Sequence, residues 1–130
     1  MKHILHADDN ESDRWAFKYL IHNLEPTIDL RSFPNGLELA QYLETMKEEI
    51  PETIIFIDLE MPIWDGIKTL KALQREPKYA NIPIYIWSSA ESKNEKNLCL
   101  KLGAKDFLSK PVKPEEWETA KETLKMIINK

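Results

Sequence analysis

Short apolar runs alternate with longer segments of helical spacing along this chain. Five of the runs have the length of a strand, at residues 3–7, 28–33, 53–57, 84–87 and 104–108. Such alternation is typical of repeated strand-helix units and a parallel sheet. The stretch 54–57 is continuously apolar, as expected for a central strand covered by helices on both faces.

Five segments have helical spacing. They are expected at 11–23, from just after Asn35 with an apolar stripe that reaches Met46, from Gly66 to just before Pro77, from about Glu91 to Gly103, and from Pro114 onward. Proline ends or opens several of them, because its ring is tolerated only in the first turn of a helix.

The aromatic and leucine positions of these helices predict which faces are buried. Trp15 and Tyr19 are expected on the buried side of the first helix, and Trp117 on that of the last. In the fourth helix the polar half, 91–97, is expected to be exposed, whereas Leu98 and Leu102 supply a short apolar stripe.

The bulk properties favour one domain spanning residues 1–130. The chain has 130 residues, is 42% hydrophobic and carries a net charge of -4 with acidic and basic residues interleaved. No basic stripe or polybasic cluster is visible, so neither nucleic acid nor a membrane is an expected partner. No signal peptide or membrane span is visible, and the single cysteine, Cys99, has no internal partner for a disulfide, so a cytoplasmic location is expected.

Polar side chains follow three of the predicted strands. Asp8 and Asp9 end the first, Asp58 the third and Ser88 the fourth. In open parallel sheets, ligands bind beyond the carboxyl ends of the strands. An Asp pair alone is typical of a solvated turn, and Asp58 alone could cap a helix or turn. Three carboxylates at one edge, however, repel one another unless a cation intervenes, and Mg²⁺ fits these oxygen donors best.

Lys110, which precedes Pro111, comes just after the fifth strand. Its ammonium could reach over the strand ends to a phosphoryl oxygen. A single loop lysine is usually a surface residue, so this position has meaning only together with the carboxylates.

Taken together, these residues resemble the receiver domain of two-component response regulators. The similarity covers nearly the whole chain and includes Asp8-Asp9, the phrase 58–66 (DLEMPIWDG), Ser88, Lys110-Pro111 and the flanking segments 82–83 and 103–108. It implies a flavodoxin-like, doubly wound sheet of five parallel strands in the order 2-1-3-4-5, flanked by five helices.

The resemblance also implies roles for individual residues. Asp58 would accept a phosphoryl group, and Asp8, Asp9, Asp58 and the backbone carbonyl of Glu60 would hold Mg²⁺ or Mn²⁺. Ser88 and Lys110 would contact the phosphoryl oxygens. The bond before Pro111 would be cis, aiming Lys110 inward.

Two positions depart from the commonest pattern of the family. Ser88 stands in place of threonine and keeps the hydroxyl. Phe107 stands in place of tyrosine, so any switching of its side chain must depend on packing. Glu60 and Ala90 stand at positions that in similar proteins flank the approach of attacking water, so the resemblance implies that they tune the lifetime of the phosphorylated state.

The implied phosphoryl donor is a sensor histidine kinase or a histidine phosphotransfer protein. The implied output surface, formed by the fourth helix, fifth strand and fifth helix, would bind a target or a second copy. No output domain follows Lys130, so the sequence is either a stand-alone receiver or part of a longer regulator.

Two other functions use similar sheets. An aspartate-dependent magnesium phosphohydrolase would carry an Asp-x-Asp pair after the first strand, whereas Asp8 and Asp9 are contiguous. A flavin mononucleotide carrier is disfavoured because the loop 8–12 is acidic and free of glycine. Trp64 could contact a partner or pack locally, and His3, His6 and His22 show no ligand spacing.

Overall fold

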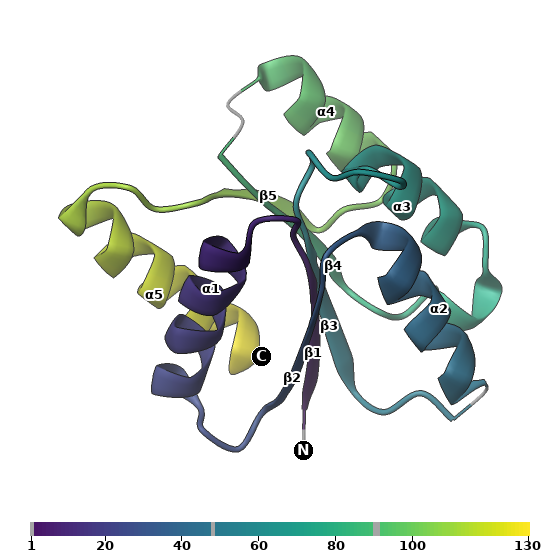
Figure 1. Ribbon diagram of the computed structural model, residues 1–130, viewed down its shortest axis with the longest axis horizontal. Helices are drawn as coiled ribbons and strands as arrows, with labels where there is room; N and C mark the ends of the chain where they lie inside the picture. Colours follow the sequence, from purple (N-terminus) through teal and green to yellow (C-terminus); the bar gives the residue numbers. More distant parts are fainter. Residues whose placement is uncertain (1, 48, 90–91) are drawn as a thin grey trace.

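Five parallel strands form the sheet in this computed structural model, which describes residues 2–47, 49–89 and 92–130. Their order is β2-β1-β3-β4-β5, with every neighbouring pair parallel (Figure 1). The strands are β1 (His3–Ala7), β2 (Asp29–Phe33), β3 (Thr53–Ile57), β4 (Ile84–Ser88) and β5 (Asp106–Ser109). The predicted doubly wound sheet and its strand order are confirmed.

Helices cover both faces of the sheet. They are α1 (Glu11–Leu24), α2 (Gly36–Met46), α3 (Gly66–Gln74), α4 (Lys93–Lys101) and α5 (Pro114–Ile128), with a short 3-10 helix, η1 (Pro77–Tyr79). In Figure 1, α1 and α5 lie on one side of the strands and α2, α3 and α4 on the other. None of the described helices has the length and apolar character needed to cross a membrane.

Polar side chains fix the starts of four helices. Asn10, Asn35, Asp65 and Ser92 each precede a helix and accept a hydrogen bond from a backbone amide in its first turn. Such caps satisfy donors that the helix itself leaves unpaired. The fourth helix therefore begins at Lys93, and the start expected at Glu91 lies outside the described residues.

Two hydrophobic cores lie on the two faces. The first contains Leu39, Ile55, Leu70 and Cys99, and the second contains Phe17, Phe56, Trp87 and Leu124. Every residue of β3 is buried, as its continuous apolar run predicts. Trp117 is half-buried and packs against the second core, which agrees with its predicted side.

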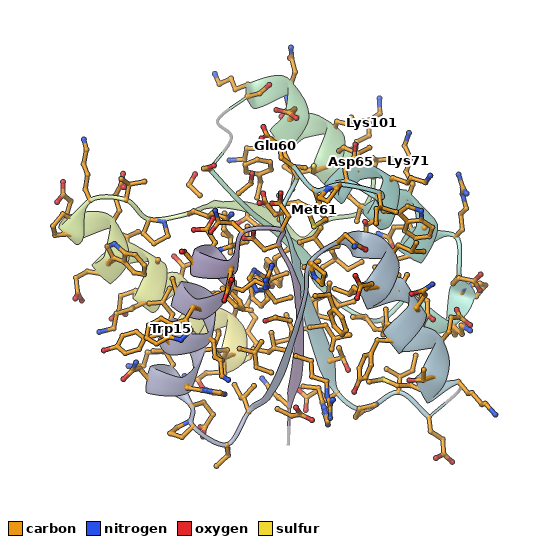
Figure 2. All side chains as sticks on the ribbon, viewed as in Figure 1. Trp15, Glu60, Met61, Asp65, Lys71 and Lys101 are labelled. Atoms are coloured by element: carbon orange, nitrogen blue, oxygen red, sulfur yellow. The ribbon has the colours of Figure 1, made fainter. Side chains whose placement is uncertain are left out.

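The predicted burial of Trp15 and Tyr19 is wrong. Their side chains are 70% and 60% exposed, and Trp15 lies on the side of α1 away from the strands (Figure 2). The two rings stack on each other instead, with centroids 6.0 Å apart. The buried stripe of α1 runs through Phe17, Leu20 and Ile21, because only one side of the helix can face the sheet.

The apolar stripe of α4 also differs from the expectation. Leu98 is 40% exposed, whereas Cys99 is fully buried and Leu102 packs against the first core. A helix turns about 100° per residue, so burying Cys99 rotates Leu98 toward solvent. The polar part of α4 is largely exposed, as predicted, at Lys93, Asn94, Lys96 and Asn97.

Candidate functional site

The strand register brings Asp8 and Asp58 out of the sheet side by side. Ala7 of β1 pairs with Ile57 of β3, and each aspartate follows its strand directly. The Asp58 amide donates to the Ala7 carbonyl at 2.9 Å, which continues the ladder by one residue. The two carboxylates therefore belong to one edge of the sheet because parallel strands share their direction.

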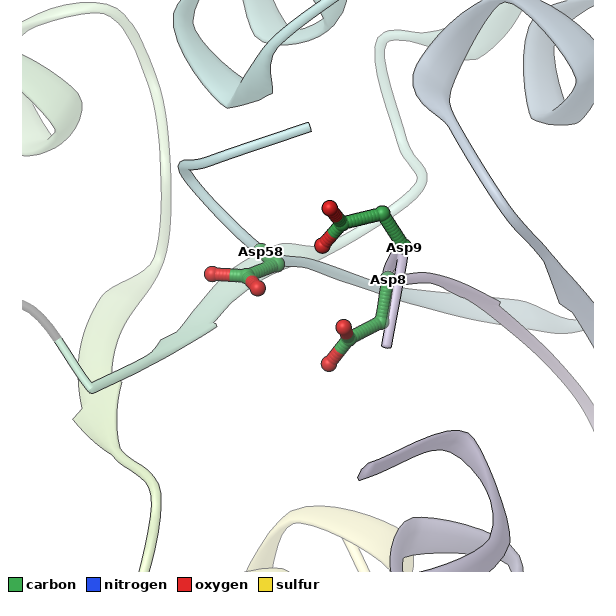
Figure 3. Close-up of side chains that lie close together, drawn as sticks. All are labelled: Asp8, Asp9 and Asp58. Carbon is green, nitrogen blue, oxygen red and sulfur yellow. The ribbon is translucent and has the colours of Figure 1, made fainter. Parts of the chain in front are cut away.

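Three carboxylates converge at this edge (Figure 3). One oxygen from each of Asp8, Asp9 and Asp58 lies within 4.8 Å of the others. Asp8 is fully buried and Asp58 is 6% exposed, whereas Asp9 is exposed. The donor set is made of carboxylate oxygens alone, which fits a hard divalent cation such as Mg²⁺ or Mn²⁺.

Lys110 supplies positive charge to this cluster. Its Nζ lies 2.7 Å from Asp8 Oδ2, 2.9 Å from Asp58 Oδ2 and 2.8 Å from Asp13 Oδ2. Burial lowers the pKa of Lys110, but the three carboxylates outweigh burial and hold the pKa above its ordinary value. The backbone amide of Lys110 donates to the Ser88 carbonyl at 2.9 Å, which ties the lysine to the end of β4.

Burial raises the pKa of Asp8, and the neighbouring Asp58 carboxylate adds to the rise. Lys110 and the Asn10 amide, which donates to Asp8 Oδ1 at 3.0 Å, act in the opposite direction. A bound cation would also favour the ionised form of Asp8. Positive charge therefore stabilises the ionised carboxylates at this edge, and Lys110 provides it.

Asp13 belongs to this network but did not emerge from the sequence. It lies in the first turn of α1, which begins immediately after the acidic loop, and its amide is capped by Asn10. A carboxylate in the first turn of a helix interacts favourably with the helix dipole, which by itself explains an aspartate at this position. Its contact with Lys110, which is 97 residues away in the chain, is what assigns it to the network.

Ser88 and Phe107 lie where the sequence places them. Ser88 ends β4 and is 1% exposed, and Phe107 is 9% exposed on the neighbouring β5, paired with Ile86. Glu60 is exposed, and its carbonyl accepts no hydrogen bond from the described residues. In Figure 2, Glu60 and Met61 lie beyond the carboxyl ends of the strands.

The predicted cis bond before Pro111 is wrong. None of the described peptide bonds is cis, so the Lys110–Pro111 bond is trans. Proline permits the cis form without requiring it, and trans remains the lower in energy for most such bonds. Lys110 reaches Asp58 from the trans geometry. Ala90 lies outside the described residues.

The loop between Asp58 and α3 is tightly folded. Gly66 donates its amide to the Leu59 carbonyl at 2.8 Å, and a Cβ at this glycine would lie 2.5 Å from the Asp58 carbonyl oxygen. Ile63 has a φ of 68°, a left-handed conformation that is costly for a β-branched residue. Trp64 is half-buried, and the ammonium of Lys68 lies 5.5 Å from the centre of its ring.

His6 is buried directly behind the carboxylates. His6 lies in β1, two residues before Asp8, which directly follows the strand, so both side chains point to the same face of the sheet. Its ring stacks on Phe17 with centroids 4.2 Å apart, and its Nε2 lies 3.9 Å from Asp8 Oδ2. Burial, with smaller contributions from Lys110 and Arg14, lowers the pKa of His6 to about 3. The ring is therefore neutral, and its structural role was among those predicted.

Comparison with known proteins places these features in context. The family model described as "Response regulator receiver domain" matches residues 4–122. A protein-glutamate methylesterase/protein-glutamine glutaminase of Clostridium acetobutylicum is 41% identical over 92 residues, which cover 69% of this chain and 25% of that protein. The chain covers 29% and 39% of two further curated relatives.

Two solved structures illustrate the fold. A response regulator receiver domain from Rhodospirillum rubrum has a TM-score of 0.86 at 21% identity, with 98% of this chain and 93% of that chain covered. The Mn²⁺-bound form of the response regulator Rcp1 has a TM-score of 0.78 at 20% identity, with 95% and 91% covered. At this identity the likeness establishes the fold.

Proposed function

Because the chain belongs to the receiver domain family of two-component response regulators, we propose that Asp58 is its phosphoacceptor. Receiver domains take part in phosphorelay signalling. The observation that supports the assignment is the Asp58 carboxylate itself, which ends the fully buried β3 beside Asp8 and 2.9 Å from Lys110. The edge thus combines a nucleophilic oxygen with positive charge for an incoming phosphoryl group.

Receiver domains bind Mg²⁺ or Mn²⁺ through an aspartate cluster, and the Rcp1 neighbour is described in a Mn²⁺-bound form. We propose that Asp8, Asp9, Asp58 and the Glu60 carbonyl hold the cation here. Two observations support this set: the grouping of carboxylate oxygens within 4.8 Å, and the Glu60 carbonyl, which accepts no hydrogen bond from the described residues. When bound, the cation neutralises charge on the phosphoryl oxygens.

The proposed transfer breaks the P–N bond of a phosphohistidine and forms a P–O bond to an Asp58 oxygen. The imidazole nitrogen keeps the electron pair of the broken bond, and the product is an acyl phosphate. Lys110 is placed to move its ammonium from the Asp58 carboxylate to a phosphoryl oxygen. The Ser88 hydroxyl contacts another phosphoryl oxygen from the end of β4.

The proposed chemistry is confined to this aspartate. Water attacking the acyl phosphate regenerates the Asp58 carboxylate, and the exposed Glu60 tunes that rate from the entrance to the site. A magnesium phosphohydrolase acting on separate substrates is the alternative, and the family match gives it no support. We therefore infer a signalling domain without a catalytic activity toward other molecules.

Receiver domains interact with histidine kinases or histidine phosphotransfer proteins, which are the donors proposed here. The proposed output surface consists of α4, β5 and α5. Ser88 and Lys110 border it, so drawing both toward a phosphoryl group would move its two sides, with Phe107 shifting by repacking. The group biases a two-state equilibrium, and hydrogen exchange should change between residues 88 and 110.

Intact-mass measurement with a small phosphodonor tests the acceptor. Wild type should gain one phosphoryl group in a magnesium-dependent, base-labile form, and Asp58→Asn should gain none. Asp29→Asn, the same chemical change at the other end of the strands, serves as the control and should be modified like wild type. An adduct on Ser88 or on a histidine would refute the assignment.

A further inference from the structure

A pocket of about 630 Å³ opens at the end of the sheet opposite to the carboxylates. Its walls come from the residues just before or at the start of four strands: Lys2 before β1, Thr53 in β3, Pro83 before β4 and Lys105 before β5. The chain's N-terminus marks this edge in Figure 1. The volume falls within the range of small-molecule sites, roughly 300–1,000 Å³.

The inner wall of this amino-edge pocket is apolar. Ile54, Tyr85 and Ile127 line it and are each less than 10% exposed, so they are fixed by the core. Ile50 and Ile82, both half-buried, extend the apolar lining outward. A ligand with an apolar body would gain free energy here by displacing water from these side chains.

Lysines surround the apolar wall. Lys2, Lys78, Lys105 and Lys130 line the pocket, and Glu52 is the acidic side chain among its described lining residues. Lys78 is paired with Glu44 at 3.0 Å. Lys2 lies 3.7 Å from Glu52 and also donates to the carbonyl oxygens of Ile128 and Lys130, whereas Lys105 makes no ion pair with any described residue. Lys105 is therefore available to attract an anion and to bind it directly.

Tyr85 adds a polar group to the lining. Its ring is held in the core by stacking on Phe56, with centroids 5.4 Å apart, and its hydroxyl has no hydrogen-bond partner among the described residues. Burial, with a contribution from Asp106, raises the pKa of Tyr85, so the hydroxyl remains a donor at neutral pH. A hydroxyl donor in a lining that also contains lysines favours an acidic group in the ligand.

We propose that the amino-edge pocket binds a small organic anion, whose apolar body packs on Ile54 and Ile127 while its acidic group meets Lys105 and the Tyr85 hydroxyl. An inorganic anion would leave the apolar wall wet, and a neutral apolar molecule would leave the lysines without a counter-charge. The site is separate from Asp58 and does not depend on the proposed phosphotransfer.

Titration with 8-anilinonaphthalene-1-sulfonate, a fluorescent apolar anion, tests the site on the folded protein. Wild type should bind one equivalent, and the amide shifts that move in NMR spectra should centre on residues 50–54 and 81–85. Lys105→Glu should weaken binding about tenfold through loss and reversal of one charge. Tyr85→Phe should weaken it a few-fold.

Three controls make the outcome decisive. Lys93→Glu changes an exposed lysine at the start of α4 by the same charge and should leave binding intact. N-phenyl-1-naphthylamine, which lacks the sulfonate, should bind more weakly. Asp58→Asn should bind like wild type. Anionic phosphatidylglycerol vesicles distinguish a lipid headgroup from a free anion: co-sedimentation lost in Lys105→Glu would assign the site to lipid.

The proposal fails if the dye does not bind, if Lys93→Glu weakens binding as much as Lys105→Glu, or if the shifts centre on the exposed Trp15–Tyr19 pair. Thermal unfolding of each variant shows that its fold is retained. Because Lys105 is exposed, its replacement leaves the core untouched.

Discussion

The two edges of the sheet carry opposite charge in opposite surroundings. At the carboxyl edge, Asp8 and Asp58 are buried, and one partly buried lysine is shared among the acidic groups. At the amino edge, lysines stand around an apolar pocket, and Lys105 is exposed. The parallel strands thus begin beside an open pocket bordered by lysines and end at a cluster of carboxylates, two of which are buried.

The difference shows that burial decides how strongly a charged group interacts with its neighbours. A charge in the interior interacts strongly with its neighbours because little water screens it. An exposed charge contributes little to stability but still attracts ligands. Substitutions at the carboxyl edge should therefore change folding and cation binding, whereas matched substitutions at the amino edge should leave both nearly unchanged.

The largest effect is expected for Lys110→Met. Without a divalent cation, its free energy of unfolding should fall by about 3–5 kcal/mol, because buried carboxylates lose their counter-charge. Lys105→Met, the matched change at the amino edge, should differ from wild type by less than about 0.5 kcal/mol. Denaturant unfolding measures both. Mg²⁺ should then stabilise Lys110→Met more than wild type, and equal losses in the two variants would contradict the comparison.

Asp9→Ala should weaken Mg²⁺ binding by about a hundredfold, since even changes outside the ligand shell cost 10- to 100-fold. The reason is the loss of one of three clustered carboxylates. Titration followed by tryptophan fluorescence, with Trp64 in the loop after Asp58 as the expected reporter, gives the affinity. Glu52→Ala removes an exposed carboxylate from the amino edge and should bind Mg²⁺ like wild type. An unchanged affinity in Asp9→Ala would refute the metal assignment.

His6 should make the protein sensitive to acid. Its folded pKa of about 3 lies below the ordinary 6.5, so the unfolded chain binds a proton that the folded protein excludes. The stability from neutral His6 is complete above pH 6.5 and is lost as the pH falls toward 3. Between pH 8 and pH 4.5, in the absence of divalent cations, the free energy of unfolding should therefore fall by about 2 kcal/mol less in His6→Phe than in wild type.

The matched control for this acid effect is His3→Phe. His3 begins the same strand at the amino edge, where it is half-buried and lies 3.2 Å from Asp29. Unfolding curves from pH 8 to pH 4.5 should separate the two variants. An identical pH dependence for both would show that burial beside the carboxylates is not the cause.

The smallest effect is expected at Ile63. Ile63→Gly should stabilise the protein by about 0.5–1 kcal/mol, because glycine adopts a φ of 68° without strain. Lys47, with a φ of 54° at the end of α2, offers the same test away from the carboxylates. Lys47→Gly should also stabilise. If only Ile63→Gly failed to do so, contacts of the isoleucine would outweigh its strain.

Much of this architecture could be predicted because it depends on local pattern. Apolar runs identified the strands, and the polar residues after them identified the site, since all parallel strands end at one edge. The sequence pattern alone thus groups Asp8, Asp9 and Asp58. The same logic placed Ser88 and Lys110 near them.

Other features depended on tertiary packing. The side of α1 that faces the sheet is decided by Phe17 and Ile21, which leaves Trp15 exposed despite its hydrophobic ring. Residue type alone could not show which side of α1 is buried, because both sides contain aromatic residues. Asp13 likewise became part of the site only when Lys110 reached it from 97 residues away.

The amino-edge pocket shows the limit of the sequence most clearly. Along the chain its lysines lie far apart among acidic residues, and interleaved charge predicts no basic surface. Folding brings Lys2, Lys78, Lys105 and Lys130 to one opening, because the chain returns to the same edge of the sheet before each parallel strand begins. Sequence determined the strands and the chemistry at their ends through short-range pattern, and only the tertiary structure decided which distant charges meet, since their meeting depends on strand order and helix packing.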